Sequence, residues 1–302
     1  MSFQSAIRSS PMDFHSWVGL GEAYSRSGRY IAALKTFHEA AKLDDDNWFV
    51  KYMIANVHRE LGEFEEARVG YMSVLDTRPK EFGVLMALAE CLLAQANSFV
   101  AKGSYGQATE SILESLKTSR EVVDTGADTF NIWKNIGDAC LLFSWIQSFA
   151  QQLPLVLVKE MISTDIDKQN LDIISEYDGV DSSMLDSLSN DNALQACLYS
   201  GILCYKRALY VSAEDRHAHA VAWFNLGCAE FRAYNCSLAN NDAHHTSAIR
   251  CFKRAIKVEP GNHEFWNALG VATAQVNARA SQHALVRSLF INEKVIIFSM
   301  GF

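Results

Sequence analysis

The sequence WVGLGEAYSRSGRYIAALKTFHEAA, residues 17–41, contains two amphipathic helical segments that are interrupted at Gly28 and Arg29. Apolar and small residues recur at the spacing of one helix face on both sides of this interruption. We therefore expect two helices joined by a tight turn, in which small residues allow close approach and large ones fill the space between the helices. The residues of the two faces are Trp17, Leu20, Gly21 and Tyr24, then Ala33, Phe37 and Ala40.

The pattern recurs after 34 residues, with size and character kept at nearly every position. The counterparts in this second unit include Gly62, Ala67 and Tyr71, and Pro79 closes the unit. Trp-x2-Leu-Gly-x2-Tyr, followed by Ala, Phe and Ala at fixed intervals, closely resembles the tetratricopeptide repeat. The resemblance implies an all-α fold, a superhelical solenoid of antiparallel helix pairs.

Later units keep the pattern but change its spacing. In the third unit Gly103, Tyr105 and Ala108 come seven residues late, which predicts a first helix that is two turns longer. The repeat positions assigned beyond this unit are Trp133, Gly137, Trp223, Leu226, Gly227, Ala248, Phe252, Ala255, Pro260, Trp266, Leu269 and Gly270.

The spacing also predicts how the chain is divided. We expect residues 1–13 to be the second half of a preceding repeat, so that Met1 is either internal to a longer array or a wrongly assigned start. Residues 14–129 would be repeats, 130–219 an interrupted repeat whose second helix comes late, and 220–294 further repeats. Residues 295–302, VIIFSMGF, break the pattern, and we expect a non-repeat tail from truncated or mis-spliced translation.

Two stretches inside the interrupted repeat are unusual. Residues 139–158 carry no charge, but three glutamines and Pro154 argue against a membrane span, so we expect a buried, lengthened helix. Residues 163–192 hold eight acidic residues and one lysine, a net charge of −7, which predicts a mobile acidic insertion. A docking strip for a basic partner or a DxD metal site is less favoured there than a solvated loop.

Composition excludes several classes of function. The net charge of −8 offers no broad basic surface for nucleic acid. Seven cysteines form no CxxC pair, and their odd number suits reduced, helix-packed thiols in the cytoplasm or alternatively the nucleus. We expect no membrane attachment.

The sequence carries no nucleophile elbow, zinc-protease or phosphate-loop motif, so we expect no enzyme activity, no cofactor and no metal. His217 with His219, and His244 with His245, are expected in solvated inter-helix loops, because two nitrogens make a poor metal site. We interpret two charged groups as solvent faces of helices, and contact of Lys253 and Lys257 with RNA phosphate is disfavoured. These groups are Glu63, Glu65, Glu66 and Arg68, and Lys253, Arg254 and Lys257.

The inner faces of the first helices are the expected binding surface, for an extended peptide or a partner helix. A carboxylate-gripping variant of this repeat needs Lys and Asn at two positions of one first helix. No unit supplies this pair, and acidic residues at these positions would repel the ligand. The residues at these positions are Val18 and Glu22, Tyr52 and Asn56, Met86 and Glu90, and Lys134 and Asp138.

Three longer runs extend the resemblance: SAIRSSPMDFHSWVGLGEAYSRSGRYIAALKTF (5–37), FWNALGVA (265–272) and SQHALVRSLFINEK (281–294). They are similar to the tetratricopeptide scaffold of the superkiller complex, of the type found in filamentous fungi, over most of residues 1–294. This implies a hetero-oligomer with an RNA helicase and WD-repeat subunits that assists the cytoplasmic exosome in 3′–5′ mRNA decay. It assigns no partner-binding residues. A scaffold of another assembly, such as a ubiquitin ligase or a transport adaptor, and the regulatory array of a glycosyltransferase or other enzyme remain alternatives.

Overall fold

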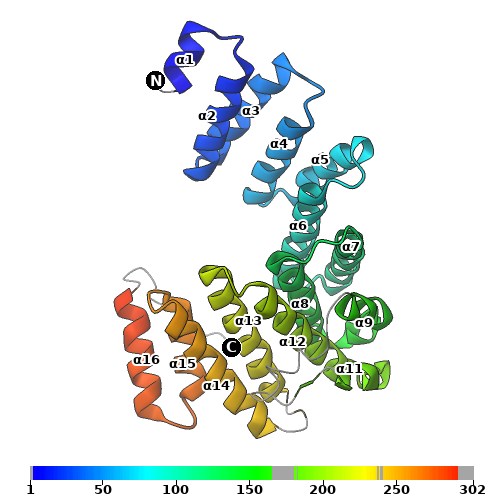
Figure 1. Cartoon of the computed structure of the whole chain (residues 1–302), viewed down its shortest axis with the longest axis vertical. Helices are drawn as coiled ribbons and strands as arrows, with labels where there is room; N and C mark the ends of the chain where they lie inside the picture. Colours follow the sequence, from blue (N-terminus) through cyan, green and yellow to red (C-terminus); the bar gives the residue numbers. More distant parts are fainter. Residues whose placement is uncertain (1–2, 165–179, 182, 237, 239–240, 292–302) are drawn as a thin grey trace. The chain divides into compact units, whose positions relative to one another are not determined.

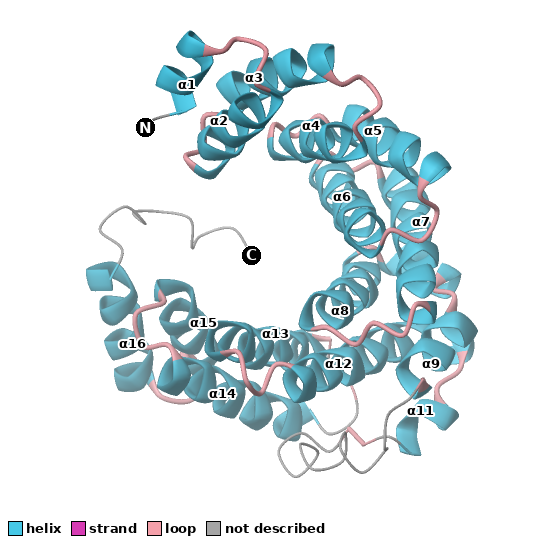
Figure 2. Ribbon diagram, turned by 45° about the horizontal axis from the view of Figure 1, so that its top comes forward, coloured by secondary structure: helices cyan, strands magenta, loops and turns pink. Residues whose placement is uncertain are grey.

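The computed structural model describes residues 3–164, 180–181, 183–236, 238 and 241–291 (Figure 1). Every regular element in these ranges is a helix, and Figure 2 shows them in cyan. The chain divides into two compact units, which are unit 1 (Met1–Gly126) and unit 2 (Ala127–Phe302). The predicted all-α fold of helix pairs is confirmed in both.

Unit 1 consists of three antiparallel helix pairs preceded by a short helix. The pairs are α2 with α3, α4 with α5, and α6 with α7. The helices are α1 (Phe3–Ser9), α2 (Phe14–Arg26), α3 (Tyr30–Leu43), α4 (Trp48–Glu60), α5 (Phe64–Thr77), α6 (Phe82–Ala101) and α7 (Tyr105–Asp124).

Unit 2 also contains three pairs, and the first of them is interrupted. The pairs are α8 with α12, α13 with α14, and α15 with α16. The elements are α8 (Phe130–Trp145), η1 (Gln147–Gln152), α9 (Leu155–Ser163), α11 (Ser183–Ser187), η2 (Asn190–Asn192), α12 (Ala193–Val211), α13 (Arg216–Asn235), α14 (Asn241–Val258), α15 (His263–Thr273) and α16 (Ala278–Ile291).

A glycine in the left-handed region makes each tight turn in unit 1. Gly28, Gly62 and Gly103 have φ angles of 71°, 78° and 76°. A side chain would be strained in this conformation, so glycine ends the first helix of each pair cheaply. The next helix can then fold back within a few residues.

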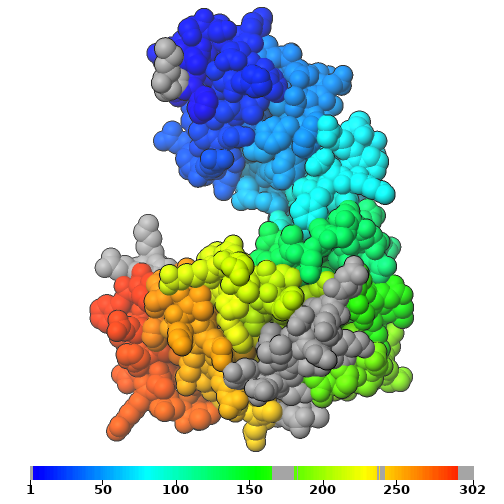
Figure 3. Space-filling view, viewed as in Figure 1, coloured from blue at the N-terminus to red at the C-terminus, as the bar shows by residue number. Residues whose placement is uncertain are grey.

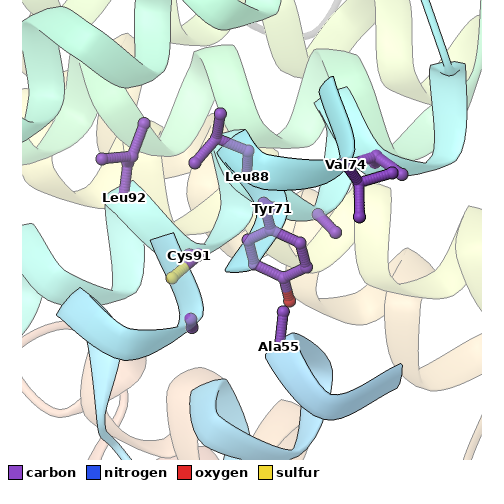
Figure 4. Close-up of a cluster of buried hydrophobic side chains, with 9 residues drawn as sticks. Ala55, Tyr71, Val74, Leu88, Cys91 and Leu92 are labelled. Carbon is purple, nitrogen blue, oxygen red and sulfur yellow. The ribbon is translucent and has the colours of Figure 1, made fainter. Parts of the chain in front are cut away.

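Within the pairs, a side chain of the second helix occupies the space where a first-helix Cβ would lie. A Cβ on Gly21 would come within 2.6 Å of the Phe37 ring, and one on Gly227 within 2.7 Å of the Phe252 ring. In α4 the small residue is Ala55, and Figure 4 shows it beside the buried ring of Tyr71. The helix axes can therefore approach closely while the aromatic rings stay buried.

The predicted lengthening of the third pair is confirmed. α6 contains 20 residues, against 13 in α2 and 13 in α4, which is two additional turns. By length and composition α6 could cross a bilayer, and it is the one such helix in the described part of the chain. However, 56% of its apolar window is buried inside the fold, as expected for a core helix.

The tryptophans at repeat positions are hydrogen-bonded near the helix start. The Trp17 indole N–H donates to the Pro11 carbonyl at 2.8 Å, and Trp266 donates to the Pro260 carbonyl at 2.9 Å. The proline that ends one repeat thus holds the first helix of the next repeat. Trp17, Leu20, Tyr24 and Trp266 are half-buried, Pro79 and Pro260 are exposed, and the remaining assigned repeat positions are buried.

The structure corrects the expectation of one lengthened, buried helix over residues 139–158. α8 ends at Trp145, the 3₁₀ helix η1 follows, and α9 begins only after Pro154. Proline has no N–H to donate, and its ring restricts the preceding residue, so the helix cannot continue through it. Trp145 and Val156 are consequently 48% and 71% exposed.

Both ends of the expected insertion, residues 163–192, contain helical residues in the structure. α9 includes Ser163, and the chain is helical again at Ser183–Ser187, where Leu185 is buried. Leu188 and Val180 are also buried, so apolar residues attach this end of the segment to unit 2. Residues 165–179 and 182 lie outside the described residues, as do Met1 and the expected tail 295–302.

Neither histidine pair lies in a loop, which corrects a second expectation. His217 and His219 belong to the first turn of α13, and His244 and His245 are buried in α14. The additional residues between Gly227 and Ala248 lengthen both helices of this pair, so the inserted histidines become part of the packed interface.

The Gly137→Ala substitution should destabilise unit 2, because its Cβ would lie 2.7 Å from the ring of Tyr205, which is buried and cannot move aside. Overpacking of this kind costs about 1–3 kcal/mol. The matched control is Gly106→Ala, whose Cβ would meet nothing within 4 Å and which should be neutral or stabilising. Urea unfolding of both variants measures the difference, and equal midpoints would refute this packing account.

Candidate functional site

The first helices of unit 1 use their polar side chains within the unit. The Tyr71 hydroxyl donates to Asn56 Oδ1 at 2.7 Å, and burial raises the pKa of Tyr71, which keeps it a donor. Arg59 bonds Glu90 at 3.0 Å and Glu60 at 3.1 Å. Asn56 and Glu90 occupy positions that a carboxylate-gripping repeat would use for its ligand. Here their hydrogen bonds stabilise the contact of α4 with its neighbours instead.

Unit 2 contains two adjacent buried cations, Lys206 and Arg207 of α12. The Arg207 guanidinium lies over the Trp133 ring at 3.9 Å and contacts Asp128 at 3.3 Å. Stacking on an indole and pairing with a carboxylate together compensate for the removal of this charge from water. Trp133 lies in α8, the first helix of the interrupted repeat, and Asp128 lies just before that helix.

The same two cations also hold the segment inserted between α8 and α12. Arg207 donates to carbonyls at the end of α9, those of Ile162 at 3.1 Å and Thr164 at 2.5 Å. Lys206 donates to the Val180 carbonyl. Unsatisfied carbonyls at a helix C-terminus attract cations, so α9 ends where a buried charge is available. Lys159 adds a bond to the Leu188 carbonyl at 2.7 Å.

Near the ends of α8 and α13 an exposed tryptophan is held in place by an arginine. The Arg232 guanidinium lies 3.7 Å from the Trp145 ring centre and donates to the Ser144 carbonyl at 2.9 Å. Trp145 and Arg232 belong to the first helices of consecutive pairs, whose inner faces were the expected binding surface. Trp145 is exposed and Arg232 is half-buried, and Trp and Arg are the residue types that dominate binding energy at protein interfaces.

A hollow of about 630 Å³ lies between the start of α8, the end of α12 and the start of α13. Two of its polar side chains already have partners. Lys134 bonds Asp138 at 2.5 Å, and His217 bonds Glu259 at 3.0 Å. A surface with both signs of charge, already paired, is suited to polar contact with a protein segment.

The remaining chemically capable groups are in packed positions. No three His, Cys, Asp or Glu side chains gather as a metal site within the described ranges. Buried His244 bonds Glu230 at 2.6 Å between α14 and α13. Burial raises the pKa of the Cys91 thiol to about 11, and a hydrogen bond with Cys204, together with burial, raises that of Cys140. These thiols stay protonated at neutral pH, as expected of helix-packed cysteines.

Sequence reasoning missed Lys206, Arg207 and Arg232. The first two form a Lys-Arg pair inside an otherwise apolar helix, and that contrast was a detectable signal of buried charge. Arg232 gave no such signal, because its partner Ser144 lies 88 residues away in the chain.

Arg207→Met should destabilise unit 2 by about 3–5 kcal/mol, because Asp128 and the α9 carbonyls lose a buried partner. Amide hydrogen exchange in this variant should accelerate most in α9. The control is Arg68→Met, since Arg68 bridges to Glu114 at 3.0 Å but its side chain is 30% exposed, against 2% for Arg207. That exposed pair should contribute at most about 1 kcal/mol. If amide hydrogen exchange in α9 stays as slow in the Arg207→Met variant as in the wild type, the Arg207 guanidinium does not hold α9.

Comparison with known proteins gives consistent relatives. The tetratricopeptide repeat family matches residues 18–82. Superkiller protein 3 of Schizosaccharomyces pombe is 36% identical over 93% of this chain, and that of Saccharomyces cerevisiae is 27% identical over 97%. Human superkiller complex protein 3 is 26% identical over 89% of the chain. The chain spans about a fifth of the length of these relatives, 20%, 20% and 16% respectively.

Solved structures share the fold at low sequence identity. A chain of the APC/C hetero-tetramer Cut9–Hcn1 is 12% identical, with a TM-score of 0.59 over 98% of this chain and 43% of that one. TTC0263, a tetratricopeptide-repeat protein of Thermus thermophilus, is 14% identical, with a TM-score of 0.51 over 86% of this chain and 99% of that one. The fold is that of a tetratricopeptide-repeat array, and the sequence is similar to one segment of superkiller protein 3.

Proposed function

We propose that the chain is a protein-binding scaffold segment of a superkiller complex, which assists the cytoplasmic exosome in 3′–5′ mRNA decay. The observation that carries this proposal is the 36% identity with superkiller protein 3 over 93% of the chain. A match of this extent covers 282 of the 302 residues.

The chemistry of the described surface supports binding rather than catalysis. Ionisable groups on the first helices are engaged with one another, as in the Arg59–Glu90 and Lys134–Asp138 pairs. Trp145 and Arg232 offer a fixed aromatic and cationic surface instead. Such groups contribute to affinity by burying area with little loss of conformational entropy. The chain is therefore proposed to have no reaction of its own.

The proposed partners follow from the resemblance to the superkiller scaffold. They are an RNA helicase and WD-repeat subunits, in a cytoplasmic hetero-oligomer. The helicase would supply the chemistry that this chain is proposed to lack. The likeness to a subunit of the APC/C is one of fold at 12% identity, so it does not favour the ubiquitin-ligase alternative.

The chain should co-elute with the helicase and a WD-repeat subunit of the same organism when the purified proteins are mixed. Size-exclusion chromatography, followed by interferometry to measure affinity, checks this expectation. If neither subunit co-elutes with the wild-type chain, the proposed function is contradicted.

Trp145→Ala should weaken that binding about tenfold or more, because an exposed Trp held by Arg232 is typical of an interface anchor. Its thermal midpoint should change little, since the side chain is 48% exposed. Val156→Ala is the matched control, because Val156 is 71% exposed and has no stacked cation. Equal affinities for the two variants would place the partner surface elsewhere.

A further inference from the structure

Four cations lie on one exposed face of α14. Arg250, Lys253, Arg254 and Lys257 are spaced at i, i+3, i+4 and i+7, which places them on a single helical stripe. All four are exposed, whereas Cys251, Phe252 and Ala255 between them are buried. We call these four residues the α14 stripe. Figure 3 shows α14, in yellow to orange, at the surface of unit 2.

Three of the four cations of the α14 stripe have no ion-pair partner in the described part of the chain. Within the described residues, Arg250, Lys253 and Lys257 make no ion pair. The helix itself carries one acidic residue, Asp242, and that residue lies in its first turn. Like charges three and four residues apart repel one another on a helix. The stripe therefore weakens its own helix slightly, in a chain whose net charge is −8.

Helix capping does not account for this arrangement. Cations near a helix C-terminus interact favourably with its last carbonyls, but only Lys257 lies in the last turn of α14. The terminal carbonyl of Val258 is already bonded to Arg216 of α13, by Nε at 2.9 Å and Nη2 at 2.7 Å. Arg250 and Lys253 lie further from this end, so the dipole gives no reason for their charge.

One cation of the stripe is held by an aromatic ring. The Arg254 guanidinium lies 5.0 Å from the ring centre of Trp223, a repeat position on α13. This contact limits the conformations of the side chain and orients the middle of the stripe. Part of the entropy cost of binding is thus already met in the unbound protein.

We propose that the α14 stripe is a docking surface for a short acidic segment of a partner protein. Charge complementarity selects this partner, because four cations over about 10 Å of helix match a few carboxylates at a similar spacing. The inference goes beyond the proposed complex and does not depend on which assembly contains the chain.

Nucleic acid fits this surface less well. Sequence-independent binding of single strands combines a long basic groove with aromatic side chains on which bases stack. The α14 stripe is confined to one helix, and no exposed large aromatic residue lies on α14. A long polyanion would also be repelled by the net charge of −8, whereas a short segment meets mainly the local charge.

Binding of a fluorescent oligoglutamate peptide, measured by anisotropy at low salt, tests the proposal on the purified full chain. Lys253→Glu/Lys257→Glu should weaken binding about tenfold, and Lys253→Arg/Lys257→Arg should retain it. Lys35→Glu/Lys117→Glu changes the net charge equally on exposed helix faces of unit 1 and should change affinity less than about twofold. Circular dichroism confirms that each variant is folded.

Three results would overturn the proposal. In the first, the wild-type chain binds oligoglutamate no better than a neutral Gly-Ser peptide. In the second, the stripe and control variants lose affinity equally. In the third result, an oligouridylate of equal charge binds more tightly than the peptide and is lost with the stripe, which would assign the surface to RNA. The proposal is supported if the arginine variant retains binding of the oligoglutamate peptide and the glutamate variant loses it.

Discussion

The contact between a small residue on one helix and a large side chain on the next fixes each helix pair of this chain. Phe37 fills the space beside Gly21, Tyr205 that beside Gly137, and Phe252 that beside Gly227. Because the ring occupies the volume of a missing Cβ, neither residue can change size without moving the helices apart. Nothing in this contact requires the two helices to be consecutive in sequence. Tyr205 and Asp138 are 67 residues apart, and their hydrogen bond of 2.6 Å closes the pair of α8 and α12 as directly as a short turn would.

That independence explains which features the sequence could predict. Helix pairs follow from local periodicity, so the small and aromatic positions, the turn at Gly28 and the lengthened α6 could be predicted from spacing alone. The periodicity of apolar residues does not show where one helix ends and the next begins. Residues 139–158 have the pattern of a long buried helix, but the structure divides them among the end of α8, the 3₁₀ helix η1 and the start of α9, which follows Pro154. The sequence predicts a loop for the histidines of α14, because the repeat spacing does not show that inserted residues lengthen both helices of the pair.

The partners of the buried charges of unit 2 could not be predicted from the sequence, for a different physical reason. Composition rules place Lys and Arg at the surface, and they fail when distant parts of the chain supply partners. Arg207 finds Asp128 and Trp133 at the start of the interrupted repeat and carbonyls at the end of α9. Asp128 lies 79 residues from Arg207, which no repeat period relates to it. The candidate binding pair Trp145–Arg232 has the same origin, since it joins the ends of two first helices that the insertion separates in sequence.

Two kinds of arginine in unit 2 illustrate how a repeat array separates folding from recognition. Arg207 is enclosed by an indole, a carboxylate and helix-end carbonyls, so its guanidinium is fully paired and holds the inserted segment. Arg250 on α14 has no such enclosure and lies on the face opposite the packed residues Cys251 and Phe252. In a solenoid each unit is stabilised by its neighbours through one face, so residues on the other face can vary without cost to the core. A buried, paired charge such as that of Arg207 stabilises the fold, whereas an exposed charge such as that of Arg250, which has no ion pair within the described residues, is available for recognition.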